Sequence, residues 1–210
     1  MQSERSNRVA KRKKPRTEVF LNIPYDKKFE RLFIAYIAGV SAFRLVPRAT
    51  LEIPDSSRRL DKILKLIGDC EYSIHDLSRV ELDRTKPRTP RFNMPFELGL
   101  TVAQEKQRKK ESWYVFESTS YRMEKSLSDL NGTDAKIHEG KVAGVFAELC
   151  QTFKRRGRQP TVQQMARIYR EVRRNQAAIL KESGAKSPYK ARAFRDICVV
   201  ASAWADRIVE

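Results

Sequence analysis

The sequence predicts an α/β fold of the flavodoxin-like kind, in which a parallel sheet of about five strands is flanked by helices and followed by a C-terminal helical hairpin. Two observations support this fold class. Short apolar segments bounded by turn residues alternate with segments in which apolar residues recur every three or four positions. After residue 158 the alternation stops, and two long helical patterns follow. We therefore expect an α/β domain over residues 17–153 and a C-terminal helical extension over residues 159–210.

Each expected element rests on a local pattern. A short apolar run that ends at Pro, Gly or a polar residue indicates a strand, and three- and four-residue spacing of apolar residues indicates an amphipathic helix. The expected elements are a strand at residues 18–23, an amphipathic helix at 27–40, a strand at 43–47 or continuing to 53, a helix capped by Ser56 or Ser57, a strand at 72–77, a helix at 91–104, a strand at 113–117, a short helix or turn at 120–130, a weak strand at 135–138, and helices at 142–153, 161–180 and from 188 onward.

The net charge of +17 is concentrated at the two ends of the chain. Residues 1–16 hold seven Lys or Arg and one acid, and residues 154–210 hold fourteen and five, whereas residues 17–153 hold 22 basic and 20 acidic residues. We expect residues 1–16 to form a disordered basic arm. Such an arm either solubilises the protein or makes non-specific contact with nucleic acid through phosphate groups.

Composition also limits the compartment and the class of site. The three cysteines, Cys70, Cys150 and Cys198, are widely spaced, which disfavours a disulfide framework and fits a reducing compartment. With only two histidines, no metal centre is expected. Neither a signal peptide nor an apolar run of the about 18 residues that a membrane span needs occurs. We expect a cytoplasmic protein that makes no membrane contact.

Several polar residues follow predicted strands or begin the next helix. In parallel sheets the carboxyl ends of the strands share one rim, where ligands bind at a switch in strand order. The residues expected on this rim are Asn22, Tyr25, Asp26, His75, Asp76, Ser78, Asn93 and Glu97. His75 and Asp76 are adjacent and should point to opposite faces of the sheet. Structural alternatives exist: a hydrogen-bonded core His75, a turn cap for Asp76, and a helix cap for Asp26.

The stretch RFNMPFELGLTVAQ, residues 91–104, places Glu97 in the first turns of an otherwise apolar helix. Asn93 is the candidate cap, and Pro95 lies near the first turn. Gly99 costs about 1 kcal/mol relative to Ala inside a helix, which suggests close approach of another backbone or of a ligand. The alternative for this stretch is a core helix with one solvated Glu.

Motifs that would indicate other chemistry do not occur. The chain has no Walker-type phosphate loop, GxGxxG, GxSxG or HExxH, which disfavours nucleoside triphosphate hydrolysis, a Rossmann dinucleotide site, an ordinary esterase and a zinc protease. Carboxylate chemistry remains. One acid can stabilise an oxocarbenium ion or attack the anomeric carbon, while a second orients the sugar or handles a proton. Glu97 and Asp76 are the candidate catalytic pair.

Three segments carry a family resemblance. EVFLNIPYDKKF, YSIHDLS and RFNMPFELGLTVA, in this order, resemble bacterial TIR-like predicted nucleotide-binding proteins, and over the same positions they are similar to nucleoside deoxyribosyltransferases. The resemblance covers roughly residues 17–153 and implies a catalytic glutamate at Glu97. Two features of these families are absent, namely the Ser-x-Trp of TIR domains and the Gly-Thr of many deoxyribosyltransferases. Asn93-Met94-Pro95 stands in that region, so the substrate is less well defined than the fold.

Three functional hypotheses follow from this resemblance. The preferred one is a TIR-like enzyme that hydrolyses or cyclises NAD or a related nucleotide at its N-glycosidic bond, with NAD as substrate rather than cofactor, and with the role in bacterial antiviral defence that the resemblance implies. The second is a deoxyribosyltransferase-like enzyme or nucleotide N-glycosidase, and the third is a non-catalytic nucleotide-binding or scaffold module. Candidate substrate-binding residues are Asn22, Tyr25, Asp26, His75, Ser78, Phe92 and Asn93. The apolar stripes of the C-terminal hairpin should pack on the α/β domain or on another subunit. We expect a homo-oligomer, with the hairpin at residues 160–209 as candidate contact.

Overall fold

The structure, a computed structural model, describes residues 16–54, 58–79, 82, 86–108, 112–130 and 132–209. The expected basic arm before Arg16 and the expected caps Ser56 and Ser57 lie outside these residues. The strands are β1 (Glu18–Asn22), β2 (Val46–Arg48), β3 (Tyr72–Asp76), β4 (Trp113–Glu117) and β5 (Lys136–Ile137). The helices are α1 (Glu30–Ala42), α2 (Arg59–Asp69), α3 (Asn93–Arg108), α4 (Arg122–Ser126), α5 (Val142–Thr152), α6 (Val162–Ser183) and α7 (Ala191–Ile208), with 3-10 helices η1 (Thr50–Glu52) and η2 (Ser128–Leu130).

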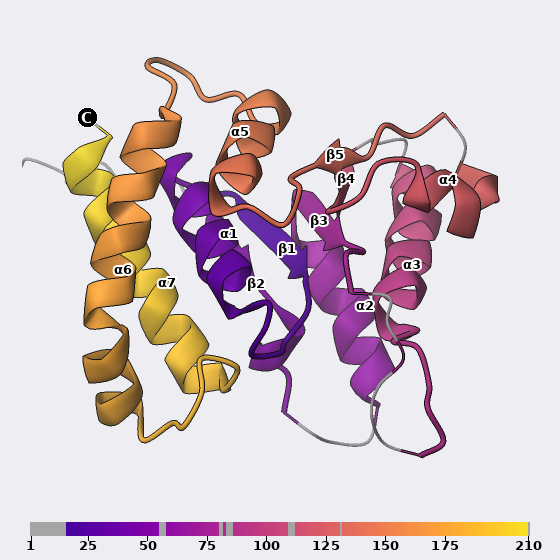
Figure 1. Ribbon diagram of the computed structural model, residues 1–210, viewed down its shortest axis with the longest axis horizontal. Coiled ribbons are helices and arrows are strands. Elements are labelled where there is room, and N and C mark those ends of the chain that lie inside the picture. The colour runs from indigo at the N-terminus through magenta and orange to yellow at the C-terminus, as the bar shows by residue number, and fades with distance from the viewer. Residues whose placement is uncertain are drawn as a thin grey trace, which may run out of the picture.

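The five strands form one sheet in the order β2-β1-β3-β4-β5. Every pairing is parallel, and the register places Asn22 opposite His75 and Asp76 opposite Phe116. The expected flavodoxin-like parallel sheet with flanking helices and a C-terminal helical pair is confirmed (Figure 1). From β1 the chain passes to β2 on one side, and β3 lies on the other side. The gap between the carboxyl ends of β1 and β3 is therefore the switch point of this sheet.

Several element boundaries differ from the expected ones. The first helix begins at Glu30 rather than at residue 27, because Asp26 Oδ1 accepts hydrogen bonds from the backbone N–H groups of Lys28 and Phe29, at 3.0 and 3.1 Å, and holds a turn there. The second strand begins only at Val46, after Arg44 in a left-handed conformation with φ of 61°. These differences lie in capping and turn geometry, which periodicity does not report.

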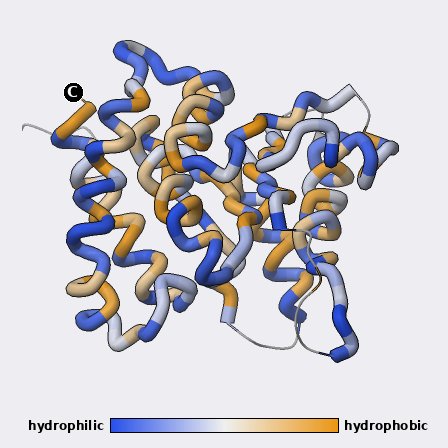
Figure 2. Tube along the Cα trace, viewed as in Figure 1, coloured by the Kyte–Doolittle hydropathy of each residue, from blue (hydrophilic) through white to orange (hydrophobic). Residues whose placement is uncertain are grey.

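Helix α1 is buried on all sides, so the expected amphipathic helix at residues 27–40 is wrong in its exposed face. Every residue from Leu32 to Ala42 is buried. The sheet and α5 cover one part of α1, and α6 and α7 cover the rest (Figure 1). Figure 2 shows α1 and the facing side of the hairpin mostly in apolar colours. A helix between two layers needs no solvent-facing polar stripe.

The C-terminal hairpin packs on the α/β domain and shares its core. Phe194 and Ile197 of α7 and Ile168 of α6 belong to the same buried cluster as Phe33 of α1. Of the two expected packings of the hairpin, on the α/β domain or on another subunit, the packing on the domain is therefore confirmed. Oligomerisation through residues 160–209 stays a prediction that would have to use the outer face of the hairpin.

Close packing occurs at glycines other than the one singled out from the sequence. A Cβ on Gly39 of α1 would clash with Leu149 of α5, and a Cβ on Gly144 of α5 would clash with the backbone carbonyl of His138. At Gly99, in contrast, a Cβ would meet no atom within 4 Å. Among the described residues no backbone approaches Gly99, so that expectation is wrong, whereas approach of a ligand there stays a prediction. The tight contacts instead join α5 to α1 and to the segment after β5.

The helices divide the sheet into two sides. Helices α1 and α5 lie on one side, where they cover Leu21 and Ile74, and helices α2 and α3 lie on the other, where Phe20 and Leu77 are buried. Among the described residues no helix is long and apolar enough to cross a membrane. At the carboxyl rim, different polar residues therefore face each side of the sheet, with Asp76 on the α1/α5 side and His75 on the α2/α3 side.

Candidate functional site

Side-chain alternation separates the two acids that the sequence suggested as a pair. His75 contacts Asn22 and Phe20 on the α2/α3 side, whereas Asp76 contacts Tyr36 of α1. The expected opposite orientation of His75 and Asp76 is thus confirmed. Glu97 belongs to α3, on the α2/α3 side. The structure therefore does not bring the carboxylates of Asp76 and Glu97 together, and the expected convergence of these two acids is wrong.

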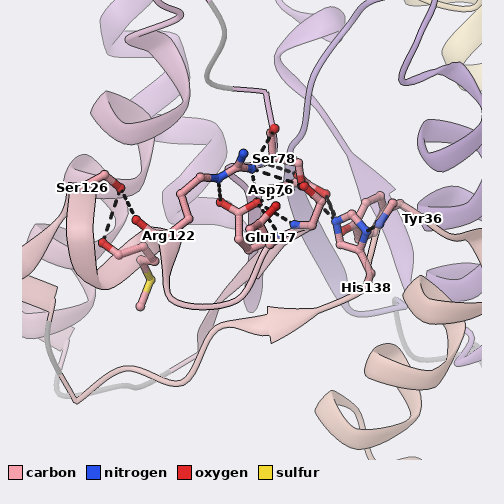
Figure 3. A network of polar contacts seen from close by, with 11 residues as sticks. Tyr36, Asp76, Ser78, Glu117, Arg122, Ser126 and His138 are labelled. Carbon is pink, nitrogen blue, oxygen red and sulfur yellow. Dashed lines mark hydrogen bonds and ion pairs between the residues drawn. The ribbon is translucent and has the colours of Figure 1, made fainter.

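Asp76 is fully buried in a network of polar contacts (Figure 3). Its Oδ2 accepts a hydrogen bond from the Tyr36 hydroxyl at 2.7 Å and lies 3.0 Å from His138 Nε2. Its Oδ1 accepts the backbone N–H of Ser78 at 2.9 Å. The expected alternative role of Asp76, capping the turn at Ser78, is confirmed. Burial, together with the nearby Asp76 carboxylate, raises the pKa of Tyr36.

The tautomer of His138 follows from its contacts. The backbone N–H of Gly140 donates to Nδ1 at 3.0 Å, so Nδ1 carries no proton. In the neutral ring the proton is then on Nε2, which donates toward Asp76 and also lies 3.0 Å from Ser78 Oγ. Both oxygens of Asp76 thus accept hydrogen bonds, from groups of α1, the loop after β3 and the segment after β5. This arrangement ties three elements together, and Asp76 is 0% exposed.

A second buried acid extends the network toward α4. Glu117, at the end of β4, forms an ion pair with Arg122, whose Nε donates to Oε2 at 2.9 Å. The Glu117 carboxylate also accepts the backbone N–H of Ser118 at 2.6 Å. Arg122 in turn donates to the backbone oxygen of Ser78 at 2.9 Å (Figure 3). This ion pair therefore joins the loops after β3 and β4.

On the other side of the sheet, a cleft of about 890 Å³ opens at the switch point. It lies between the loop after β1, the first turn of α2 and the first turns of α3. The lining residues are Pro24, Tyr25, Thr50, Arg59, Leu60, Ile63, Thr89, Pro90, Arg91, Phe92, Asn93, Met94, Phe96 and Glu97. The volume is that of a site for a small molecule or nucleotide. A smaller cavity of about 240 Å³ lies on the other side of residues 90–94, beside Glu117.

Glu97 is the buried acid of this cleft. Its side chain lines the cleft although the residue is only 8% exposed, and its Oε2 has no hydrogen-bond partner within the part of the chain that the structure describes. Burial raises the pKa of Glu97 from 4.5 to about 7, and the positive charge of Arg59 opposes this rise. Desolvation without a compensating donor is thus the dominant effect. At neutral pH a large fraction of Glu97 is protonated.

Asn22 and His75 form a buried pair beneath the start of α3. Asn22 Nδ2 donates to the backbone oxygen of Met94 at 2.8 Å and lies 2.9 Å from His75 Nδ1. Because an amide nitrogen only donates, His75 Nδ1 must accept, and its proton is on Nε2. Burial lowers the pKa of His75 to about 3, so the ring is neutral. Asn22 therefore anchors the first turn of α3, and with it the turn that carries Glu97, to β1.

The other expected site residues lie around the cleft mouth or act as structural groups. Tyr25 lines the cleft, and its hydroxyl lies 3.3 Å from Thr50 Oγ1. Phe92 is 63% exposed and Asn93 is exposed, and both line the cleft. Asn93 is the first residue of α3 rather than its cap, since the Phe92 carbonyl already accepts the N–H of Phe96 at 3.0 Å. Asp26 caps the turn before α1 and forms ion pairs with two arginines, Arg79 at 3.1 Å and Arg91 at 3.3 Å.

Sequence reasoning missed four residues of these sites. Glu117 ends β4, so the rule that placed Asp76 on the rim would have found it as well. Arg59 is the first residue of α2, and no local sequence pattern indicates that it approaches the cleft. His138 and Arg122 reach Asp76 and Glu117 through tertiary packing, which neither periodicity nor spacing reports.

Comparison with known proteins gives no assignment, because no protein-family model, curated protein or solved structure matches the chain. The resemblance to TIR-like proteins therefore stays a prediction based on the three quoted segments. Among the described residues, no group of three or more His, Cys, Asp or Glu side chains is placed to hold a metal ion.

Proposed function

We propose that the chain binds a nucleotide of the NAD type in the switch-point cleft and cleaves its N-glycosidic bond, with Glu97 as the catalytic carboxylate. The observation that carries this proposal is the buried Glu97, at the place where ligands bind in this sheet topology. One of its oxygens has no partner in the part of the chain that the structure describes, and its pKa is raised to about 7. The TIR-like resemblance of residues 91–104 points to the same residue.

The lining of the cleft suits the parts of such a substrate. Phe92 and Phe96, which are 63% and 55% exposed, can stack on a base. Arg59 and Arg91 bring positive charge to the cleft, as a diphosphate requires. Glu97 lies deeper, where a ribose would bring its anomeric carbon. The positive nicotinamide ring of NAD would also favour the ionised form of Glu97.

Glu97 acts alone among the acids in this proposal. The bond from the anomeric carbon to nicotinamide breaks, and nicotinamide leaves as a neutral molecule with the bonding electron pair. The Glu97 carboxylate stabilises the developing positive charge on the sugar. Water then adds to the anomeric carbon and loses a proton, which gives ADP-ribose, whereas attack by a group of the same nucleotide would give a cyclic product. Asp76, whose oxygens are occupied on the other side of the sheet, has a structural role here.

The test is to incubate the purified chain with NAD, both dilute and at a concentration that favours self-association, and to measure released nicotinamide by chromatography. Glu97→Gln should reduce release on the order of 100-fold or more. Glu105→Gln is the matched control, because Glu105 is also a buried acid of α3 but accepts the Ser112 hydroxyl at 2.8 Å and does not line the cleft. No release by the wild type in either condition, or equal release by Glu97→Gln, would overturn the proposal.

The pH dependence gives a second test of the same role. Because Glu97 must be ionised to stabilise a cation, kcat/KM should rise with pH through the pKa of the free protein, about 7, and then level off. The midpoint of kcat should lie lower, since the bound nicotinamide cation favours ionised Glu97. A rate that falls as pH rises through this range would assign Glu97 as a proton donor instead.

One observation favours a second candidate, a non-catalytic nucleotide-binding module. Asp76 and Glu97 lie on opposite sides of the sheet, so the cleft contains only one of the two acids that were expected to act together. A deoxyribosyltransferase that uses Glu97 and Asp76 as a catalytic pair has less support for the same reason. Calorimetric titration with NAD separates the two remaining candidates: binding without turnover by the wild type would favour the module.

A further inference from the structure

The outer face of α6 carries a row of basic residues. The members of this row, which we name the α6 ladder, are Arg167, Arg170, Arg174 and Lys181. All four are exposed. Their spacing of three, four and seven residues places them on one stripe of a helix with about 3.6 residues per turn. The buried stripe of α6, which includes Met165, Val172 and Ile179, lies on the opposite side of the helix.

The positive charge of the ladder is largely uncompensated. Arg174 forms an ion pair with Glu171 at 2.8 Å, but Arg167, Arg170 and Lys181 form no ion pair with any residue that the structure describes. Like charges at three- and four-residue spacing destabilise a helix by about 0.2–0.5 kcal/mol per pair. The buried stripe and a capping box, formed by Thr161 and Gln164, hold α6 despite this repulsion. A polyanion bound along this face would relieve it.

We propose that the α6 ladder binds the phosphate backbone of double-stranded nucleic acid. From Arg167 to Lys181 the helix rises about 21 Å, which matches about six phosphates along one strand of a duplex. Arginine, which makes up most of the ladder, binds phosphate through a planar fork of donors. Because contacts to phosphate carry no sequence information, the ladder binds without sequence preference. This surface lies on the C-terminal hairpin, and its role does not depend on the activity of the cleft.

An anionic membrane is the main competing partner for a basic helix. Helices that lie on membranes insert an apolar face beside their basic face. The apolar stripe of α6 is already buried against α1 and α7. On the exposed side, the residues between Arg174 and Lys181 include Ala177 and Ala178, which are small. The ladder therefore has charge for phosphate but no large apolar group to insert into lipid.

The experiment measures binding of the full chain to a short DNA duplex of mixed sequence at a series of salt concentrations. The test variant changes all four ladder residues to Gln, which preserves helix propensity on an exposed face. Each lost phosphate contact reduces the slope of log K against log salt by about 0.9, so the slope should become shallower by about 3–4. The affinity at low salt should fall on the order of 100-fold.

The matched control changes four exposed lysines outside α6 to Gln and so removes the same charge: Lys28, Lys65, Lys106 and Lys125. This variant should keep a slope within about one of the wild type. Glu97→Gln should bind the duplex as tightly as the wild type. The proposal is overturned if the ladder variant and the control variant change the slope equally, or if the ladder change weakens binding to anionic phosphatidylserine vesicles but leaves duplex binding intact. Thermal melting shows that each variant is folded.

Discussion

Two buried carboxylates, one on each side of the sheet, differ in whether they have hydrogen-bond donors around them. On the α1/α5 side, Asp76 has donors on both oxygens, and the residues around it come from α1, β3 and the end of β5. On the α2/α3 side, one oxygen of Glu97 has no hydrogen-bond partner among the described residues, and the pKa of Glu97 is raised. Both acids are buried, and the sequence predicts both of them at the carboxyl rim of the sheet. The difference lies in how completely tertiary packing supplies donors.

A buried carboxylate with hydrogen-bond donors on both oxygens stabilises the fold. A buried carboxylate that lacks donors in a cleft destabilises it until a ligand binds. The Asp76 side is also covered by a second layer, α6 and α7, and the Glu97 side opens into the switch-point cleft. Removing the charge of Asp76 should therefore lower the free energy of unfolding, and removing that of Glu97 should raise it.

The largest effect is expected for Asp76→Ala. The change removes the acceptor of the Tyr36 hydroxyl and of the Ser78 backbone N–H, and leaves His138 Nε2 only Ser78 Oγ. The free energy of unfolding should therefore fall by about 3–5 kcal/mol. Urea denaturation measures it. Asp76→Asn keeps one acceptor oxygen and should lose less. A loss below about 1 kcal/mol for Asp76→Ala would contradict a structural role for the network.

Glu97→Gln should instead stabilise the protein, and only at higher pH. A carboxyl whose pKa is raised to about 7 in the folded state binds its proton more tightly there than in the unfolded chain. Stability is therefore lost as pH rises from about 4.5 to about 7 and stays reduced above that, by about 3 kcal/mol. Gln does not ionise, so the variant should exceed the wild type by up to this amount at pH 8. Near pH 4 the two should be similar, and an equal difference at both pH values would contradict the assignment.

Gly144→Ala should destabilise the α1/α5 side by about 1–3 kcal/mol. The new Cβ would clash with the backbone carbonyl of His138, and either α5 or the His138 segment must move. Gly144→Ala should lower the thermal midpoint when it is made in the wild-type protein. Because His138 donates to Asp76, the same substitution should lower the midpoint less in the Asp76→Ala variant. Strictly additive effects would show that Gly144 and the network are independent.

Gly99→Ala gives the smallest effect and the opposite sign. The position is helical, and a Cβ there meets no atom within 4 Å. The substitution should therefore raise the free energy of unfolding by about 0.5–1 kcal/mol through helix propensity alone. Nicotinamide release should stay as in the wild type. Lower stability or lost activity would restore a functional reason for glycine at this position.

Local patterns predicted most elements because strands and helices here differ clearly in period and length. The strand at residues 113–117 and the helix that starts at residue 142 were placed at the observed positions. The α1 segment shows the limit of such patterns. Its apolar residues at helical spacing predicted a half-exposed helix, and only the packing of α6 and α7 against its outer side explains why Leu32 to Ala42 are all buried.

By itself the sequence determined the order of strands and helices, the rim that carries Asn22, Asp76 and Glu97, and the opposite orientation of His75 and Asp76. Only the tertiary structure decided which side of the sheet each residue faces, because both sides of a parallel sheet are covered by helices and its strands are apolar on both faces. That choice placed Asp76 among donors from α1 and the end of β5 and left Glu97 in the cleft. The chemical difference between the two acids arises from neighbours that are distant in sequence, and no local pattern contains them.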